Sequence, residues 1–313
     1  MVLKQQVCPS IQHNPQKTGP PSATSSFSHH HTPFSHDDPP FGHDDILKTL
    51  PSGTAKYGFR NLYDLNEKVN RLRSRGRQYV AFLEVPAKII QATSDDSSSV
   101  FGGLITYEPA TRTLLIKIPS SEHEIAASEL LVLLTRKFEQ MGVKRELRST
   151  GSARVGRPDW VKEPDVSWQP KSLGPDINDP SLTIEVAKSE TRSRLDVDAR
   201  RWIESRRSGT SVVLTVNISS SNVKPEITFA VWLRTPNPRS TSTRSSRHGS
   251  RKEQECTLCY DKGTRQTSGS KPLSLPFKNI FLREPVGTEK DITLSSTDLE
   301  EVAHEVWSQK GLV

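Results

Sequence analysis

Alternating apolar strands and amphipathic helices occupy the middle of the chain, and this order restricts the possible folds more than any other feature. Residues 122–141 carry apolar side chains at helical spacing, with a capping-box pattern at Ser121 and Glu124 and a stop at Gly142. The next elements are expected as strands at 143–150, 161–170 and 182–188, a helix at 192–207, and strands at 211–219 and 226–234. This order predicts an α/β (α+β) core over residues 120–235, with a mixed central β-sheet flanked by helices.

Structured extensions are expected on both sides of this core. Before it, residues 56–119 predict a helix within 61–76, a strand at 79–90 and a β-hairpin at 102–119. After it, residues 273–313 predict a strand or extended segment at 273–285 and an amphipathic helix at 297–310. We expect the C-terminal strand and helix to pack on the core.

Two segments are predicted to be disordered, because they carry too few apolar side chains to offset the entropy of ordering. The first is an N-terminal arm, residues 1–55, which is rich in Ser, His, Asp and Pro and could bind a metal only weakly. The second is an insertion, residues 236–272, with eight Lys or Arg against three Asp or Glu. Cys256 and Cys259 form a CxxC there, but zinc needs two further ligands and only His248 lies close in sequence.

The composition excludes several classes of protein. No run approaches the about 18 consecutive apolar residues of a membrane span, and three cysteines in 313 residues cannot form a disulfide scaffold. The first residues lack the apolar stretch of a signal peptide, so we expect an intracellular protein of the nucleus or cytoplasm. A net charge of +7 permits contact with nucleic acid without requiring it.

Two carboxylates interrupt the predicted core strands. Asp165 follows Pro164 at the start of an apolar run, and Glu185 lies between Ile184 and Val186. A carboxylate inside an apolar strand is costly unless it is paired, hydrogen-bonded or bound to a cation. Two such groups on neighbouring strands would form an oxygen-lined pocket suited to Mg²⁺ or Mn²⁺. A metal there can generate a nucleophile from water and neutralise the charge that develops on a phosphodiester.

This arrangement resembles the PD-(D/E)XK nuclease-like superfamily, which has the restriction-endonuclease-like fold. Pro164-Asp165 is followed twenty positions later by Glu185-Val186-Ala187, and the surroundings are similar to a branch of uncharacterised fungal proteins and to bacterial proteins with an E-V-x-S motif. The resemblance implies that Asp165 and Glu185 hold a divalent metal, with the backbone carbonyl of Val186 as a third ligand. It also implies a glutamate from the preceding helix, for which Glu129 is one candidate and Glu124 the other.

The chain departs from the motif at its lysine. That residue should stand two positions after Glu185, where the sequence has Ala187, and strand alternation points Lys188 to the opposite face. In some relatives the basic group comes from the following helix, which here carries Arg194, Arg200 and Arg201. Arg201 is our candidate catalytic residue; arginine can stabilise phosphate charge but cannot act as a base.

Structural roles can also explain the same residues. Asp165 could only stabilise a turn, and Glu185 could pair with Arg194 or Arg201 as a buried ion pair. Asp159 belongs to a second Pro-Asp pair but lacks a strand-like continuation, and His123 is expected at the surface or in a helix cap.

Three functions therefore stay open. The first is a Mg²⁺-dependent phosphodiesterase acting on DNA or RNA. The second is a catalytically degenerate nuclease fold that binds nucleic acid or another protein. The third is a scaffold whose disordered arms act through partners. The sequence indicates neither the substrate nor the oligomeric state.

Overall fold

The computed structural model describes residues 45–93, 100–175, 177–188, 192–205, 207–219, 221, 223–236, 248–262 and 266–313. Most of the predicted N-terminal arm lies outside these residues. The end of that arm is ordered, because helix α1 (Asp45–Lys48) carries the buried side chain of Ile46. Ile46 and Leu50 pack against a small cluster formed by Tyr79, Ala81 and Leu115, so the arm does not extend to residue 55 as expected.

Within the described residues, the larger sheet has seven strands in the order β13-β12-β11-β10-β9-β8-β5. Its strands are β5 (Leu147–Ser149), β8 (Val166–Pro170), β9 (Leu182–Lys188), β10 (Val212–Ile218), β11 (Glu226–Pro236), β12 (His248–Asp261) and β13 (Gln266–Ser268). β9 and β10 are parallel, and the other neighbouring pairs of this sheet are antiparallel. The predicted mixed central sheet is confirmed.

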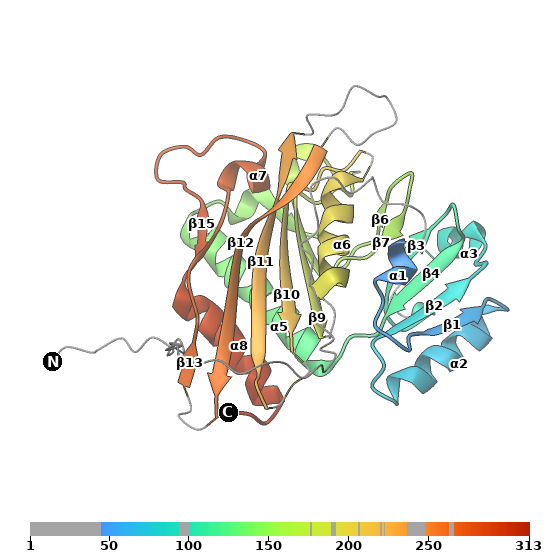
Figure 1. The fold of residues 1–313 in the computed structure, drawn as a ribbon. Coiled ribbons are helices and arrows are strands. Elements are labelled where there is room, and N and C mark those ends of the chain that lie inside the picture. The colour runs from blue at the N-terminus through green and yellow to red at the C-terminus, as the bar shows by residue number, and fades with distance from the viewer. Residues whose placement is uncertain are drawn as a thin grey trace, which may run out of the picture. The chain divides into compact units, whose positions relative to one another are not determined.

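Helices cover both faces of the larger sheet (Figure 1). α5 (Ser121–Gln140), α7 (Phe277–Phe281) and α8 (Ser296–Gln309) pack on one face, and α6 (Arg192–Glu204) packs on the other. Side chains alternate between the two faces of a strand. Ile184 and Val186 therefore join the core formed with α5 and α8, whereas Glu185 of the same strand points toward α6.

A smaller mixed sheet precedes the larger one in the chain. Its described strands lie in the order β1-β2-β4-β3-β7-β6. They are β1 (Ala55–Gly58), β2 (Tyr79–Leu83), β3 (Leu104–Glu108), β4 (Thr113–Lys117), β6 (Val155–Gly156) and β7 (Val161–Lys162). α2 (Leu62–Arg73) and α3 (Ala87–Ala92) contribute Leu65, Val69 and Ile90 to the core on one face of this sheet. The predicted hairpin is confirmed as β3 and β4.

The run predicted as one strand at 161–170 is divided between the two sheets. Residues 161 and 162 form β7 of the smaller sheet, and residues 166–170 form β8 of the larger one. Pro164 lies between them and has no N–H to continue a ladder. Residues 155–162, which we expected inside the core, therefore complete the smaller sheet.

Several predicted boundaries differ from the observed ones. Residues 87–90, predicted as the end of a strand, belong to the helix α3 that follows Pro86, and residues 144–146, also predicted as strand, form a 3₁₀ helix. A second 3₁₀ helix covers Lys171–Leu173. The N-cap of α5 is Ser120, whose hydroxyl accepts from the N–H of His123, one position before the expected cap. The segment 273–285 contains the short strand β14 (Leu273–Leu275), which pairs with β15 (Ile292–Leu294), and then α7.

The predicted disorder of the insertion is wrong for residues 248–261, which form the long strand β12 against β11, and for residues 266–268, which form β13 against β12. Every second side chain near its end is buried, namely Cys256, Leu258 and Tyr260. Because side chains alternate, Cys259 lies on the opposite face of the strand from Cys256. The CxxC spacing therefore does not bring these two thiols to a common zinc ion.

Cys256 is expected to react with a thiol reagent at neutral pH at least ~10-fold more slowly than Cys259 in the native protein. Burial raises the pKa of the Cys256 thiol and lowers the fraction of reactive thiolate. Alkylation followed by peptide mass spectrometry measures both rates, and the denatured chain, in which they should become similar, is the control. Equal rates in the native protein would contradict the burial of the Cys256 side chain on the inner face of β12.

No helix in the described part of the chain is long and apolar enough to span a lipid bilayer.

Candidate functional site

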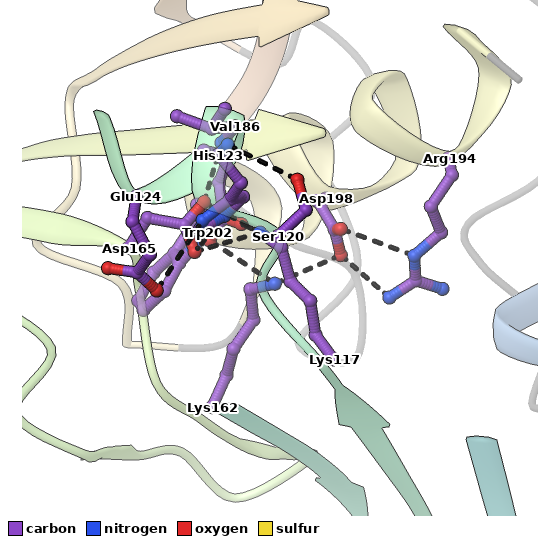
Figure 2. Close-up of polar contacts among 11 residues, drawn as sticks. Lys117, Ser120, His123, Glu124, Lys162, Asp165, Val186, Arg194, Asp198 and Trp202 are labelled. Carbon is purple, nitrogen blue, oxygen red and sulfur yellow. Dashed lines mark hydrogen bonds and ion pairs between the residues drawn. The ribbon is translucent and has the colours of Figure 1, made fainter. Parts of the chain in front are cut away.

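Asp165 lies in the segment that crosses between the sheets, directly before β8. β8 pairs with β9 only as far as Ile184. The backbone N–H of Val186, two residues further along β9, therefore has no partner in β8. That N–H donates to Asp165 Oδ2 at 2.5 Å. Lys117 Nζ donates to both carboxylate oxygens, at 2.8 Å and 2.6 Å, and His123 Nε2 lies 3.0 Å from Oδ1 (Figure 2).

The Asp165 carboxylate is held in its charged form. Its side chain is only 1% exposed, and burial by itself raises the pKa of a carboxyl. The charges of His123 and Lys117 outweigh burial and hold the pKa of Asp165 well below its usual range. The pKa of Lys117 changes in the complementary direction: burial lowers it, but Asp165 and Glu185 raise it further than burial lowers it.

Glu185 reaches the same lysine from the centre of β9. Its Oε2 lies 3.5 Å from Lys117 Nζ. Its Oε1 accepts a hydrogen bond from Trp202 Nε1 at 2.6 Å and lies 3.2 Å from Lys162 Nζ. Burial raises the pKa of Glu185, although both lysines act to lower it. Asp165 and Glu185 are therefore brought together on a single ammonium group.

A third carboxylate extends the cluster. Asp198 Oδ1 lies 3.2 Å from Lys162 Nζ, and the Arg194 guanidinium donates to both Asp198 oxygens, at 2.8 Å and 3.2 Å. Burial raises the pKa of Asp198, but Arg194 and Lys162 outweigh it, so the pKa is lowered. We refer below to the acid–lysine cluster, which consists of Lys117, His123, Lys162, Asp165, Glu185 and Asp198.

Both lysines of the acid–lysine cluster come from the smaller sheet. Lys117 is the last residue of β4 and Lys162 the last of β7. Glu185 and Asp198 come from the larger sheet and from α6. The cluster thus lies where the two sheets meet, and it joins them through ion pairs.

The other predicted site residues have different partners. Arg201 Nη2 donates to Glu108 of β3 at 3.1 Å, so it forms a further contact between α6 and the smaller sheet.

The two candidate glutamates lie on α5. Glu129 is half-buried; it follows His123 by six residues, which corresponds to about 9 Å along the helix axis. Glu124 is exposed. Lys188 pairs with Glu122 at 2.6 Å, and the buried Ala187 is the residue that shares a face with Glu185.

The partners of the two acids could not be recognised from the sequence. Lys117 and Lys162 carry no local signal, because each is a single lysine at the end of a short apolar strand. Asp198 is one of many charges on a polar helix. His123, which we expected at the surface or in a cap, is only 3% exposed: its backbone N–H is capped by Ser120 while its side chain reaches Asp165.

The donor atoms suit a hard divalent ion, but their number is small. Asp165 and Glu185 supply carboxylate oxygens on side chains that are each 1% exposed. The carbonyl of Val186 points to the same edge of β9 as its N–H, since both groups of an extended residue face the same neighbouring strand. Within the described residues, no group of three or more His, Cys, Asp or Glu side chains is arranged to hold a metal. The types of ligand atom therefore fit a divalent ion. In this structure the ammonium group of Lys117 contacts both acids.

A surface cleft of about 440 Å³ lies elsewhere, between α5 and β15. Lys137, Lys290 and Asp291 are among the residues that line it, and Lys137 is paired with Asp298. No member of the acid–lysine cluster lines this cleft, and its lining offers no concentration of buried charge.

Fold and site together define a mixed α/β protein with buried carboxylates at the junction of two sheets. No family model matches the chain, and no curated protein matches it. Among solved structures, the chain is similar to a crystal structure from Anabaena variabilis ATCC 29413, described as "a putative nuclease belonging to DUF820". The TM-score is 0.36 and the sequence identity 16%, over 64% of this chain and 90% of that one.

Proposed function

We propose that this protein is a metal-dependent phosphodiesterase of the PD-(D/E)XK nuclease-like type, with Mg²⁺ or Mn²⁺ held by Asp165 and Glu185. The observation that carries the proposal is the meeting of these two carboxylates, each 1% exposed, on one ammonium group. Two buried carboxylates at one point require a cation between them. Hydrolysis of a phosphodiester needs a water molecule activated for attack, and it needs the negative charge that develops on the phosphate to be neutralised at the same place.

The residues of the chain would hold and orient the ligand atoms. The Val186 N–H and His123 fix the position of Asp165, and Trp202 fixes Glu185 through its indole N–H. The Val186 carbonyl completes the proposed ligand set. The bound ion would supply charge neutralisation and a lowered pKa of bound water.

Arg201 remains the proposed contact to the phosphate. It uses one guanidinium nitrogen for Glu108, while its Nη1 is buried and has no hydrogen-bond partner among the described residues. A guanidinium with an unused donor can bind a phosphate oxygen.

Asp165→Asn is expected to reduce Mg²⁺- or Mn²⁺-dependent nicking of plasmid DNA, or cleavage of RNA, at least ~100-fold, because it removes a charged ligand of the ion. The purified full chain is incubated with each nucleic acid, with metal and with chelator. Asp159→Asn is the matched control, since Asp159 also follows a proline but is exposed. Cleavage that survives chelation, or that Asp165→Asn leaves unchanged, would contradict the proposal.

A second function is favoured by one specific observation. Lys117 and Lys162 already neutralise the acids without a metal, and Ala187 replaces the lysine of the motif. A catalytically degenerate fold of this kind would bind nucleic acid or a protein without converting it. In the same assay it would give no product with metal, and any nucleic-acid binding would weaken steeply as salt rises.

A further inference from the structure

Lys117 occupies the position between the two acids that a cation requires. Its Nζ lies 2.6 Å and 2.8 Å from the Asp165 oxygens and 3.5 Å from Glu185 Oε2. A divalent ion bound by the same oxygens would lie roughly 2.0–2.6 Å from them. Two cations in contact with the same buried oxygens repel each other strongly, because the surroundings screen charge poorly.

Lys117 is also the most exposed member of the acid–lysine cluster. Its side chain is 12% exposed, against 1% for Asp165 and Glu185, 3% for Lys162 and 5% for Asp198. The cluster therefore opens to solvent mainly at Lys117. A long and flexible side chain at the end of β4 can leave this position at smaller cost than Lys162, which is almost completely enclosed.

We infer that Lys117 is a built-in competitor of the divalent ion, so that the ion enters only when the ammonium leaves Asp165 and Glu185. This inference rests on the proposed function, because it takes these two acids as the ligands. In the ion-free protein the lysine neutralises the acids and links β4 to the larger sheet. Ion binding and this link are then mutually exclusive, and the affinity for the ion is lowered by the free energy needed to displace the ammonium.

Titration of the full chain with Mn²⁺ by calorimetry, with free Mn²⁺ followed by electron paramagnetic resonance, tests the competition. Lys117→Met is expected to bind Mn²⁺ at least ~10-fold more tightly than the unmodified protein, since no ammonium must be displaced. Lys188→Met is the matched control, because Lys188 pairs with Glu122 and not with the two acids. This variant should bind Mn²⁺ with the same affinity as the unmodified protein. Lys117→Gln, which keeps a hydrogen-bond donor without a charge, replaces Lys117→Met if the latter does not fold.

The outcomes separate this inference from the proposed function. If Asp165→Asn abolishes Mn²⁺ binding but Lys117→Met and Lys117→Gln bind no more tightly than the unmodified protein, the competition is wrong and the metal site stands. If no variant binds Mn²⁺, or if Lys117→Met/Asp165→Asn binds as tightly as Lys117→Met, the metal site itself is wrong.

A second measurement uses the unmodified protein. Saturating Mn²⁺ is expected to raise the rate at which an amine reagent modifies Lys117 by several-fold, with Lys188 as the internal reference in the same mass spectrum. An unchanged rate at Lys117 under saturation would overturn the inference.

Discussion

Lys162→Met is expected to lower the free energy of unfolding by about 3–5 kcal/mol, the usual cost of leaving a buried charge without its partner. Lys162 Nζ lies 3.2 Å from both Glu185 Oε1 and Asp198 Oδ1, and its side chain is 3% exposed. Methionine fills a similar volume without the charge. Glu185 would then keep its Trp202 hydrogen bond but lose one of its two cations, in a position that water does not reach.

Urea unfolding measures this loss, and two further variants identify its cause. Lys68→Met removes a lysine from the more exposed Asp64 pair on α2 and should cost no more than about 0.5 kcal/mol. Lys162→Met/Glu185→Gln should recover part of the loss, because the neutral amide still accepts from Trp202 but needs no cation. If Lys162→Met costs as little as Lys68→Met, the ion pairs between the sheets do not contribute to stability.

Replacement of residues 248–261 by a flexible Gly/Ser linker is expected to abolish cooperative folding. The segment looks dispensable by composition, but it forms β12 and pairs with β11 along most of its length. Each large apolar side chain that it buries, such as Leu258 and Tyr260, contributes about 1.5–3 kcal/mol. Their sum, together with the lost strand pairing, approaches the total stability of a typical domain, about 5–15 kcal/mol.

Thermal unfolding followed by circular dichroism measures the effect. The matched control is Arg251→Ser/Glu253→Ser, which changes an exposed ion pair of the same strand and should leave the midpoint nearly unchanged. A cooperative transition at the usual midpoint in the linker variant would show that β12 is not part of the folded core.

Sequence patterns predicted the elements whose apolar side chains follow a simple period. The helix at 122–141 and the strand at 182–188 agree closely with α5 and β9. β12 could not be predicted because a strand with one buried face needs apolar residues only at alternate positions. In β12 this alternation begins only at Cys256, so the first half of the strand looks polar. The division of 161–170 was missed because both halves have the composition of a strand, and the sheet to which each belongs depends on contacts distant in sequence.

Of the acid–lysine cluster, only the carboxylates Asp165 and Glu185 could be predicted from the sequence. Asp165 and Glu185 stand out because a charge inside an apolar strand needs an explanation. Their partners give no such signal: Lys117 is 48 residues from Asp165 and 68 from Glu185, and a terminal lysine on a short strand is normally solvated. Which cation meets which acid is decided by how the two sheets associate, and no local periodicity records that.

Three consecutive residues make the crossing between the sheets, and their side chains serve different neighbours. Glu163 accepts from the N–H of Ile105 and from Arg154 in and beside the smaller sheet, whereas Asp165 accepts from Val186 in the larger one. Pro164, between them, permits little rotation of the backbone. Because Glu163 is bound to β3 and lies only two residues before Asp165, a displacement of β3 would also move the carboxylate of Asp165. Substitutions elsewhere in the smaller sheet can thus shift the Asp165 carboxylate while every residue of the acid–lysine cluster stays the same.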